Sequence, residues 1–190
     1  MRKGGENMNK YFIKVSSLIC AFLLLTSCVS RHSIERESNN NLSQKTYSNI
    51  HVGWLDLGEG NWTTFGYDSK EMWNEAIDRI NKDCLQPYLK EQLQGKALSF
   101  SQFKDDPPPN GSDLYVWFSN TEIEGNWPGG PFDYIYTTVH FTDVQSNKEA
   151  YQAAIKASSM SLNPGANYTV EGRLGSTAYN IGLMISDKLR

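Results

Sequence analysis

Two pairs of acidic residues have a spacing that could support hydrolysis: Asp56 with Glu59, and Glu122 with Glu124. A glycosidase uses two carboxyl groups roughly 5 to 9 Å apart, and one of the two needs a raised pKa. Both pairs lie close to glycines, where acidic side chains are commonly solvated. Hydrolysis by a carboxylate pair is therefore an alternative function and not the first prediction.

Other catalytic and metal-binding motifs do not occur in the sequence. It has no G-x-S-x-G, H-E-x-x-H, C-x-x-C or phosphate-binding loop. The three histidines, His32, His51 and His140, are scattered, and no group of ligand residues has recognisable metal-site spacing. Cys84 occupies an apolar helical position, which favours a buried thiol over a nucleophile. The sequence thus predicts no catalytic residue, no metal and no cofactor.

The segment Leu25-Thr26-Ser27-Cys28 resembles the bacterial lipobox, in which an aliphatic and two small residues precede a lipid-modified cysteine. Lys10 and Lys14 precede it, followed by an apolar run over residues 18–25, as in a secretory signal peptide. This run is shorter than the roughly 20 residues that span a bilayer. The pattern predicts a lipoprotein signal peptide over residues 1–27.

Cleavage before Cys28 would leave the mature chain with lipid on the cysteine sulfur and an acyl chain such as palmitate on its amine. Several acyl chains together anchor a protein stably in a membrane. We therefore expect attachment to the membrane through Cys28, in the cell envelope. The expected location is the outer membrane, facing the periplasm or the cell surface.

The composition is that of one globular domain: 190 residues, 39% of them apolar, with a net charge of −3. The first 27 residues hold four basic residues and one acidic residue, so the remainder has a net charge of −6. Nucleic-acid binding needs clustered lysine and arginine to neutralise phosphates. This acidic body predicts no nucleic-acid partner.

Aromatic residues gather in two loops of the body. Tryptophan and tyrosine at loop tips anchor protein partners or stack on sugars, and they can also fold back as a lid over a small core. Both interpretations are open. The candidate binding residues are Trp62, Tyr67, Trp127, Phe132 and Tyr134.

Several elements must position these groups. Residues 28–48 are polar and rich in Asn and Ser, which predicts a disordered tether before a folded domain over residues 49–190. Alternating residues from Ile50 predict a strand. Trp73, Ile77, Ile80 and Cys84 then recur at helical spacing and predict one buried stripe. Pro87 predicts that this helix ends or kinks near Gln86.

The second half of the body shows strand patterns over residues 97–103, 114–119 and 134–143. Residues 149–160 have high helix propensity, yet the preceding D-V-Q-S-N-K is also typical of a hairpin turn. The chain ends in a predicted helix with a buried face. Beside that face a ridge of small residues is expected to pack on a sheet; it comprises Gly175, Ala178, Gly182 and Ser186.

The stretch D-L-Y-V-W-F-S, the later Y-I-Y-T-T-V-H-F-T-D-V-Q-S-N-K and the closing Y-N-I-G-L-M-I-S-D-K-L resemble a group of uncharacterised bacterial lipoproteins. The domain of that group is similar in shape to the curli-secretion lipoprotein and to the amino-terminal domain of the Tol-system propeller protein. The resemblance implies a hairpin strand over residues 149–160. It also implies one α+β domain with a mixed or antiparallel sheet, ordered β-α-β-β-β-β-α, and helices on one face.

Together these observations predict a membrane-anchored envelope lipoprotein. Its first expected role is a non-enzymatic binding or assembly module for a protein or glycan partner. The alternative is an envelope hydrolase that uses one of the carboxylate pairs.

Overall fold

The computed structural model describes residues 32–58, 61–104, 106–125, 132–159 and 169–190. The predicted signal peptide, Cys28 and Trp127 lie outside this part of the chain. In order, the elements are β1 (His32–Asn39), a short 3-10 helix (Leu42–Gln44), β2 (Asn49–Val52), α2 (Lys70–Arg79), a π-helical segment (Ile80–Leu85), α3 (Gln86–Gln92), β3 (Ala97–Phe100), β4 (Leu114–Gly125), β5 (Phe132–Asp143), β6 (Lys148–Ser158) and α4 (Val170–Leu189).

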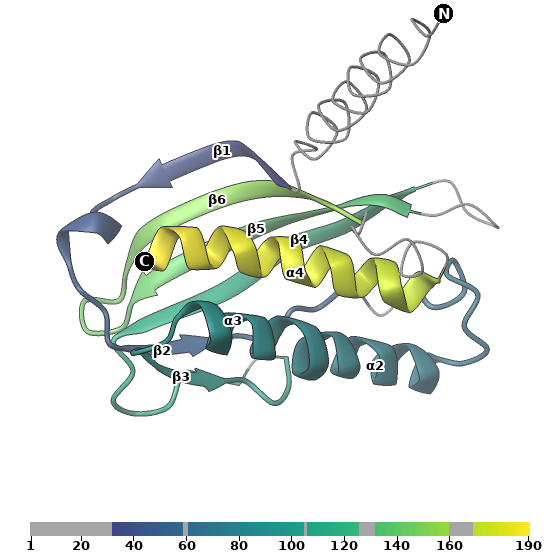
Figure 1. The fold of residues 1–190 in the computed structure, drawn as a ribbon, viewed down its shortest axis with the longest axis horizontal. Coiled ribbons are helices and arrows are strands. Elements are labelled where there is room, and N and C mark those ends of the chain that lie inside the picture. Colours follow the sequence, from purple (N-terminus) through teal and green to yellow (C-terminus); the bar gives the residue numbers. More distant parts are fainter. Residues whose placement is uncertain (1–31, 59–60, 105, 126–131, 160–168) are drawn as a thin grey trace, which may run out of the picture. The chain divides into compact units, whose positions relative to one another are not determined.

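The strands form one six-stranded mixed sheet in the order β1-β6-β5-β4-β2-β3 (Figure 1). β2 runs parallel to β3 and β4, because α2 and α3 carry the chain across the sheet, and the remaining pairings are antiparallel. The hairpin interpretation of residues 149–160 is confirmed as far as Ser158, since β6 pairs with β5. The turn between β5 and β6 is stabilised by Asp143 Oδ1, which accepts the Ser146 N–H at 2.8 Å. The predicted α+β class is confirmed.

Helices α2, α3 and α4 cover one face of the sheet, as predicted (Figure 1). On β5, Ile135, Val139 and Phe141 alternate toward these helices and are fully buried. From α2 and the π-helical segment, Trp73 and Ile80 enter the same core. The opposite face of the sheet has no helix over it within the described residues, and its side chains are more polar.

The predicted disordered tether over residues 28–48 is wrong from His32 onward. His32–Asn39 form the edge strand β1, which pairs antiparallel with β6. The side chains of β1 are mostly exposed, so their polarity indicated a tether, but a strand at a sheet edge needs only backbone hydrogen bonds. Glu37 adds a link to the body by accepting from Tyr151 Oη at 2.7 Å.

The helix break predicted at Pro87 takes the form of a change in helix type. Regular α-helix ends at Arg79 and continues as a π-helical segment before α3 begins at Gln86. Pro87 thereby falls in the first turn of α3, where a backbone N–H has no partner within its own helix. The chain therefore continues in the same direction through the proline.

The small-residue ridge of α4 faces another helix and not the sheet, which corrects the sequence-based expectation. A Cβ added to Gly182 would lie 2.7 Å from Cδ1 of Tyr88 on α3. A Cβ on Gly175 would lie 3.1 Å from Sγ of Cys84. The glycines thus allow α4 to approach the π-helical segment and α3 closely.

The half-buried Cys84 thiol has a pKa raised by burial, which opposes a role as nucleophile.

Candidate functional site

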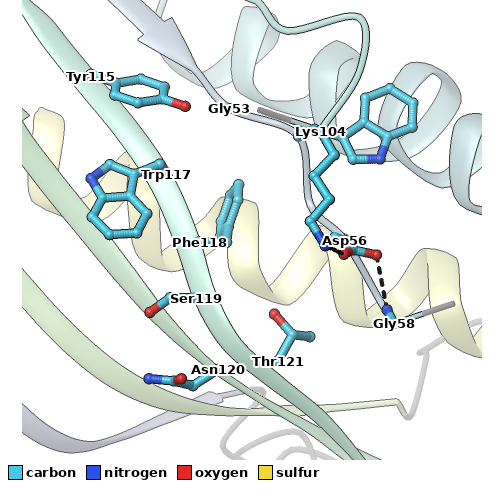
Figure 2. Close-up of a pocket in the computed structure, with 11 residues that line it drawn as sticks. Gly53, Asp56, Gly58, Lys104, Tyr115, Trp117, Phe118, Ser119, Asn120 and Thr121 are labelled. Carbon is cyan, nitrogen blue, oxygen red and sulfur yellow. Dashed lines mark hydrogen bonds and ion pairs between the residues drawn. The ribbon is translucent and has the colours of Figure 1, made fainter. Parts of the chain in front are cut away.

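The candidate site is a cavity beside β4, at the point where β4 extends beyond the end of its neighbour β2. β2 pairs with β4 only from Leu114 to Val116, and the chain leaves the sheet after the Gly53 N–H donates to Val116 O at 2.7 Å. Beyond Val116, no described strand lies on this side of β4. The resulting cavity has a volume of about 320 Å³. Its lining residues are Gly53, Trp54, Asp56, Gly58, Lys104, Tyr115, Trp117, Phe118, Ser119, Asn120 and Thr121 (Figure 2).

Aromatic side chains form one wall of this cavity. Figure 2 shows Tyr115, Trp117 and Ser119 on one side of β4, and Phe118 and Thr121 on the other. Gly53 lets the chain pass close to Tyr115, because an added Cβ would lie 3.1 Å from Tyr115 Oη and 3.2 Å from a backbone carbonyl oxygen. The close approach of the loop after β2 therefore holds the Tyr115 ring in place.

An ion pair forms the opposite wall. Lys104 Nζ lies 2.5 Å from Asp56 Oδ2, and Asp56 Oδ1 accepts the Gly58 N–H at 2.9 Å. Lys104 is more exposed than Asp56, whose carboxylate is held by these two donors. The cavity thus has an aromatic side and a side with hydrogen-bonding groups, and both come from segments that leave or enter the sheet.

A polar chain on the helix-free face connects the cavity-lining Trp117 and Ser119 to the neighbouring strands. Trp117 stacks on His140, with ring centroids 3.8 Å apart and planes inclined by 8°, and its Nε1 donates to Thr142 Oγ1 at 3.1 Å. His140 is 8% exposed. Its Nε2 lies 2.7 Å from Ser119 Oγ and its Nδ1 lies 2.6 Å from Glu149 Oε1. Three adjacent strands therefore contribute to one hydrogen-bonded chain.

A β-bulge follows Ser119 directly. Ser119 pairs with Thr138, but the next pair along the ladder is Glu122 with Tyr136, so β4 carries one extra residue. Asn120 takes up the change with a φ of 51°, in the left-handed region that asparagine tolerates better than most residues. Bulges commonly re-aim side chains next to functional sites.

The first predicted aromatic loop packs against the protein's own core. Trp62 and Tyr67 are half-buried beside it, and Tyr67 meets the Trp73 ring edge to face, with centroids 5.3 Å apart. Burial raises the pKa of Tyr67 to about 12. This arrangement matches the lid alternative for the loop. The positions of Trp62 and Tyr67 do not support ligand binding by these residues, which stays a prediction.

The second aromatic loop is only partly described. Trp127 lies outside the described residues, and Phe132 is described only as a backbone position in β5. Tyr134 is half-buried on β5, where Lys156 Nζ lies 3.9 Å from its ring centroid. It is not among the residues that line the cavity.

Within the described residues, neither predicted carboxylate pair forms a hydrolytic site. Asp56 is paired with Lys104, and Glu59 lies outside the described residues. Glu122 and Glu124 are exposed, and Glu124 accepts from Tyr136 Oη at 2.5 Å. The described residues contain no cluster of three potential metal ligands. Nor does any described helix have the length and apolar character of a membrane span.

Sequence reasoning missed Tyr115, Trp117, Ser119, His140 and Glu149 as site residues. Tyr115 and Trp117 form an apolar second face of a strand, which indicates a covered or ligand-binding surface. The link between Ser119, His140 and Glu149 has no local signal, because it depends on the register of three strands.

The fold and the cavity define a class: a single α+β domain with a mixed sheet, helices on one face and a ligand-sized cavity at the edge of β4. No family model matches the sequence, and no curated protein matches it. Among solved structures it is similar to the PelC dodecamer from Paraburkholderia phytofirmans and to the dodecamer of a PelC point variant from the same organism. Each is 9% identical to this chain with a TM-score of 0.41, and each match covers 79% of this chain. The match covers 94% of the PelC chain and 93% of the chain of the point variant.

A Xanthomonas campestris protein of family DUF330 is also similar, at 10% identity and a TM-score of 0.41, over 75% of this chain and 83% of that protein. These values do not place the chain in a family. Its predicted membership of a lipoprotein group therefore stays a prediction.

Proposed function

We propose that this protein is a lipid-anchored module of the bacterial cell envelope that binds a glycan in the cavity beside β4. The lipobox at Cys28 supports the anchor, and the lining of the cavity supports the ligand class. The observation that carries the proposal is the pairing of an aromatic wall with a hydrogen-bonding wall across a space of about 320 Å³. Cavities that bind small ligands begin at roughly this volume.

The chemistry of the two walls suits a sugar. An aromatic face packs against the C–H groups of a pyranose ring, and carboxylate, ammonium and amide groups bond its hydroxyls. Tyr115 and Trp117 supply the rings, while Asp56, Lys104 and Asn120 supply donors and acceptors. Trp117 is already fixed by its stacking on His140, so little side-chain entropy would be lost on binding.

The competing occupant is an extended peptide. The edge of β4 beyond Val116 has no described strand beside it, and such an edge can take up a strand from a partner. A peptide would bind mainly through its backbone, so its affinity would depend little on the cavity's side chains. A glycan would depend on them directly, which allows the two to be distinguished.

Replacing Tyr115 with alanine is expected to weaken glycan binding at least tenfold, about 1.4 kcal/mol, because one stacking surface is removed. The probe is a set of disaccharide fragments of peptidoglycan, titrated while tryptophan fluorescence is recorded. The control is Tyr179→Ala, since Tyr179 is an exposed tyrosine on α4, over the other face of the sheet. Equal weakening by both variants, or saturation by an unstructured peptide but by no glycan fragment, would refute the glycan proposal.

Replacing Cys28 with alanine is expected to remove lipid attachment completely, because the cysteine sulfur is the lipid acceptor. The measurement is the incorporation of labelled palmitate in bacteria, together with fractionation of membrane and soluble protein. Cys84→Ala is the matched control and should remain lipid-labelled, since Cys84 packs between helices. A lipid-labelled, membrane-bound Cys28→Ala protein would contradict the anchor.

A further inference from the structure

We propose that Ser119, His140 and Glu149 form a nucleophile–base–carboxylate triad that hydrolyses carboxylic esters of a small acyl group at the cavity. The activity goes beyond glycan binding and does not depend on it. Ser119 Oγ lies 2.7 Å from His140 Nε2, and Glu149 Oε1 lies 2.6 Å from His140 Nδ1. These are the two contacts that activate a serine in acyl-transfer enzymes.

Strand register places the three residues on one face of the sheet. Ser119 is on β4, His140 on β5 and Glu149 on β6. His140 pairs directly with Trp117, and Glu149 pairs with Thr142, so each triad contact is a diagonal one between neighbouring strands. The Trp117 ring, stacked on the imidazole, limits its rotation and keeps both nitrogens directed at their partners.

The direction of the two hydrogen bonds follows from the chemistry of the groups. A carboxylate oxygen accepts hydrogen bonds and cannot donate them, so His140 Nδ1 carries the proton shared with Glu149. In a neutral imidazole Nε2 is then the acceptor, and the Ser119 hydroxyl donates to it. This is the arrangement in which histidine can remove the serine proton during attack.

A second histidine of the same sheet provides the comparison. His51 Nδ1 lies 2.8 Å from Ser99 Oγ, and its Nε2 lies 3.0 Å from Ser101 Oγ. Both its ring nitrogens therefore meet hydroxyl groups, which can donate or accept. Burial lowers the pKa of His51. His51 is a buried histidine satisfied by its neighbours, whereas His140 is oriented by a carboxylate.

A buried histidine needs hydrogen-bond partners in any fold, so the contacts alone do not argue for chemistry. Two further observations do. Ser119 lines the cavity and is half-exposed, so it borders the space that a substrate would occupy. Asn120, the next residue, has a positive φ and lines the same cavity with an exposed side chain. The side-chain amide N–H group of Asn120 is the candidate donor to the oxyanion that forms on attack.

The reaction proceeds in two balanced steps. Ser119 Oγ attacks the carbonyl carbon while its proton moves to His140 Nε2; the bond to the alkoxy group breaks, and the alcohol leaves with that proton. Water then attacks the acyl-serine, gives a proton to His140 Nε2, and the carboxylic acid leaves as Ser119 recovers its proton. Glu149 acts as a positioning residue that holds the tautomer and stabilises the imidazolium. The volume of about 320 Å³ restricts the acyl group to a small one.

The direct test is labelling of the full-length protein with a fluorophosphonate, which forms a stable bond to an activated serine and releases fluoride. Peptide mass spectrometry should locate the label on Ser119. The same protein should hydrolyse 4-nitrophenyl acetate above the rate of buffer. Ser119→Ala should lose the label and reduce this hydrolysis by a factor on the order of 100 or more. Ser99→Ala, beside the other histidine, should retain both.

The positioning role of Glu149 has a separate readout. Glu149→Gln keeps the size of the side chain, so the variant should stay folded while the rate of labelling falls by a factor on the order of 10² to 10⁴. A purely structural residue would change the melting temperature and leave the labelling rate of the folded protein unchanged. The triad is overturned if the wild-type protein, shown by its melting curve to be folded, takes no label on Ser119. It is also overturned if Glu149→Gln is labelled at the wild-type rate.

Discussion

Trp73→Ala is expected to lower the free energy of unfolding by about 3–5 kcal/mol, which is the cost of removing a fully buried large aromatic side chain. Trp73 has no exposed surface. Its Nε1 donates to Gly58 O at 2.9 Å, and Phe65 stacks on it with centroids 5.5 Å apart. The substitution therefore leaves a cavity and releases the loop over residues 61–67 from the core. Urea denaturation followed by circular dichroism measures the change.

Trp73→Phe is the matched control for this experiment. It keeps most of the buried volume but removes the hydrogen bond to Gly58, so its cost should be clearly smaller. A loss below about 1 kcal/mol for Trp73→Ala would be smaller than any ordinary core truncation. Such a result would show that the loop and helix α2 do not pack as the structure has them.

Asn81→Leu is expected to lower the free energy of unfolding by about 2–5 kcal/mol, because buried backbone groups lose their partners. Asn81 is 2% exposed. Its Oδ1 accepts the Leu55 N–H at 3.0 Å, and its Nδ2 donates to Leu55 O and to Ile77 O, each at 3.0 Å. Leucine has a similar volume but can replace none of these bonds. The loss is measured by denaturation in urea.

Asn81 also holds the chain that builds one wall of the cavity. Leu55 lies between Trp54 and Asp56, both of which line it. Asn81→Asp retains an acceptor for the Leu55 N–H but places a carboxyl oxygen against the carbonyl oxygens of Leu55 and Ile77, so it should be at least as destabilising as Asn81→Leu. If Asn81→Leu were as stable as the wild type, the side chain could not be the bridge between the loop and the helix.

Patterns that depend on near neighbours in the chain could be interpreted correctly. The alternation on β5 and the helical recurrence of Trp73, Ile77 and Ile80 each indicate which side chains face the core. These patterns follow from the geometry of a single strand or helix, because burial selects apolar residues at its period. The lipobox is equally local, but Cys28 lies outside the described residues, so the anchor stays a prediction.

Patterns that depend on distant segments could not be interpreted in this way. The polar side chains of β1 predict a tether, but the strand forms through backbone hydrogen bonds to β6, and those bonds are independent of side-chain type. Similarly, a run of small residues on α4 predicts that another element packs closely against this helix, but it does not indicate which element. Only packing decides that the partner is the π-helical segment and α3.

The sequence by itself thus determined the α+β class and the faces of the main elements, and it also predicts a lipid anchor. The tertiary structure decided where the site lies. The cavity exists because β2 ends early beside the longer β4, and the chain from Ser119 to His140 to Glu149 exists because three strands adopt one register. Both results depend on how segments far apart in the sequence align, and a one-residue shift in that alignment would turn these side chains to the other face of the sheet.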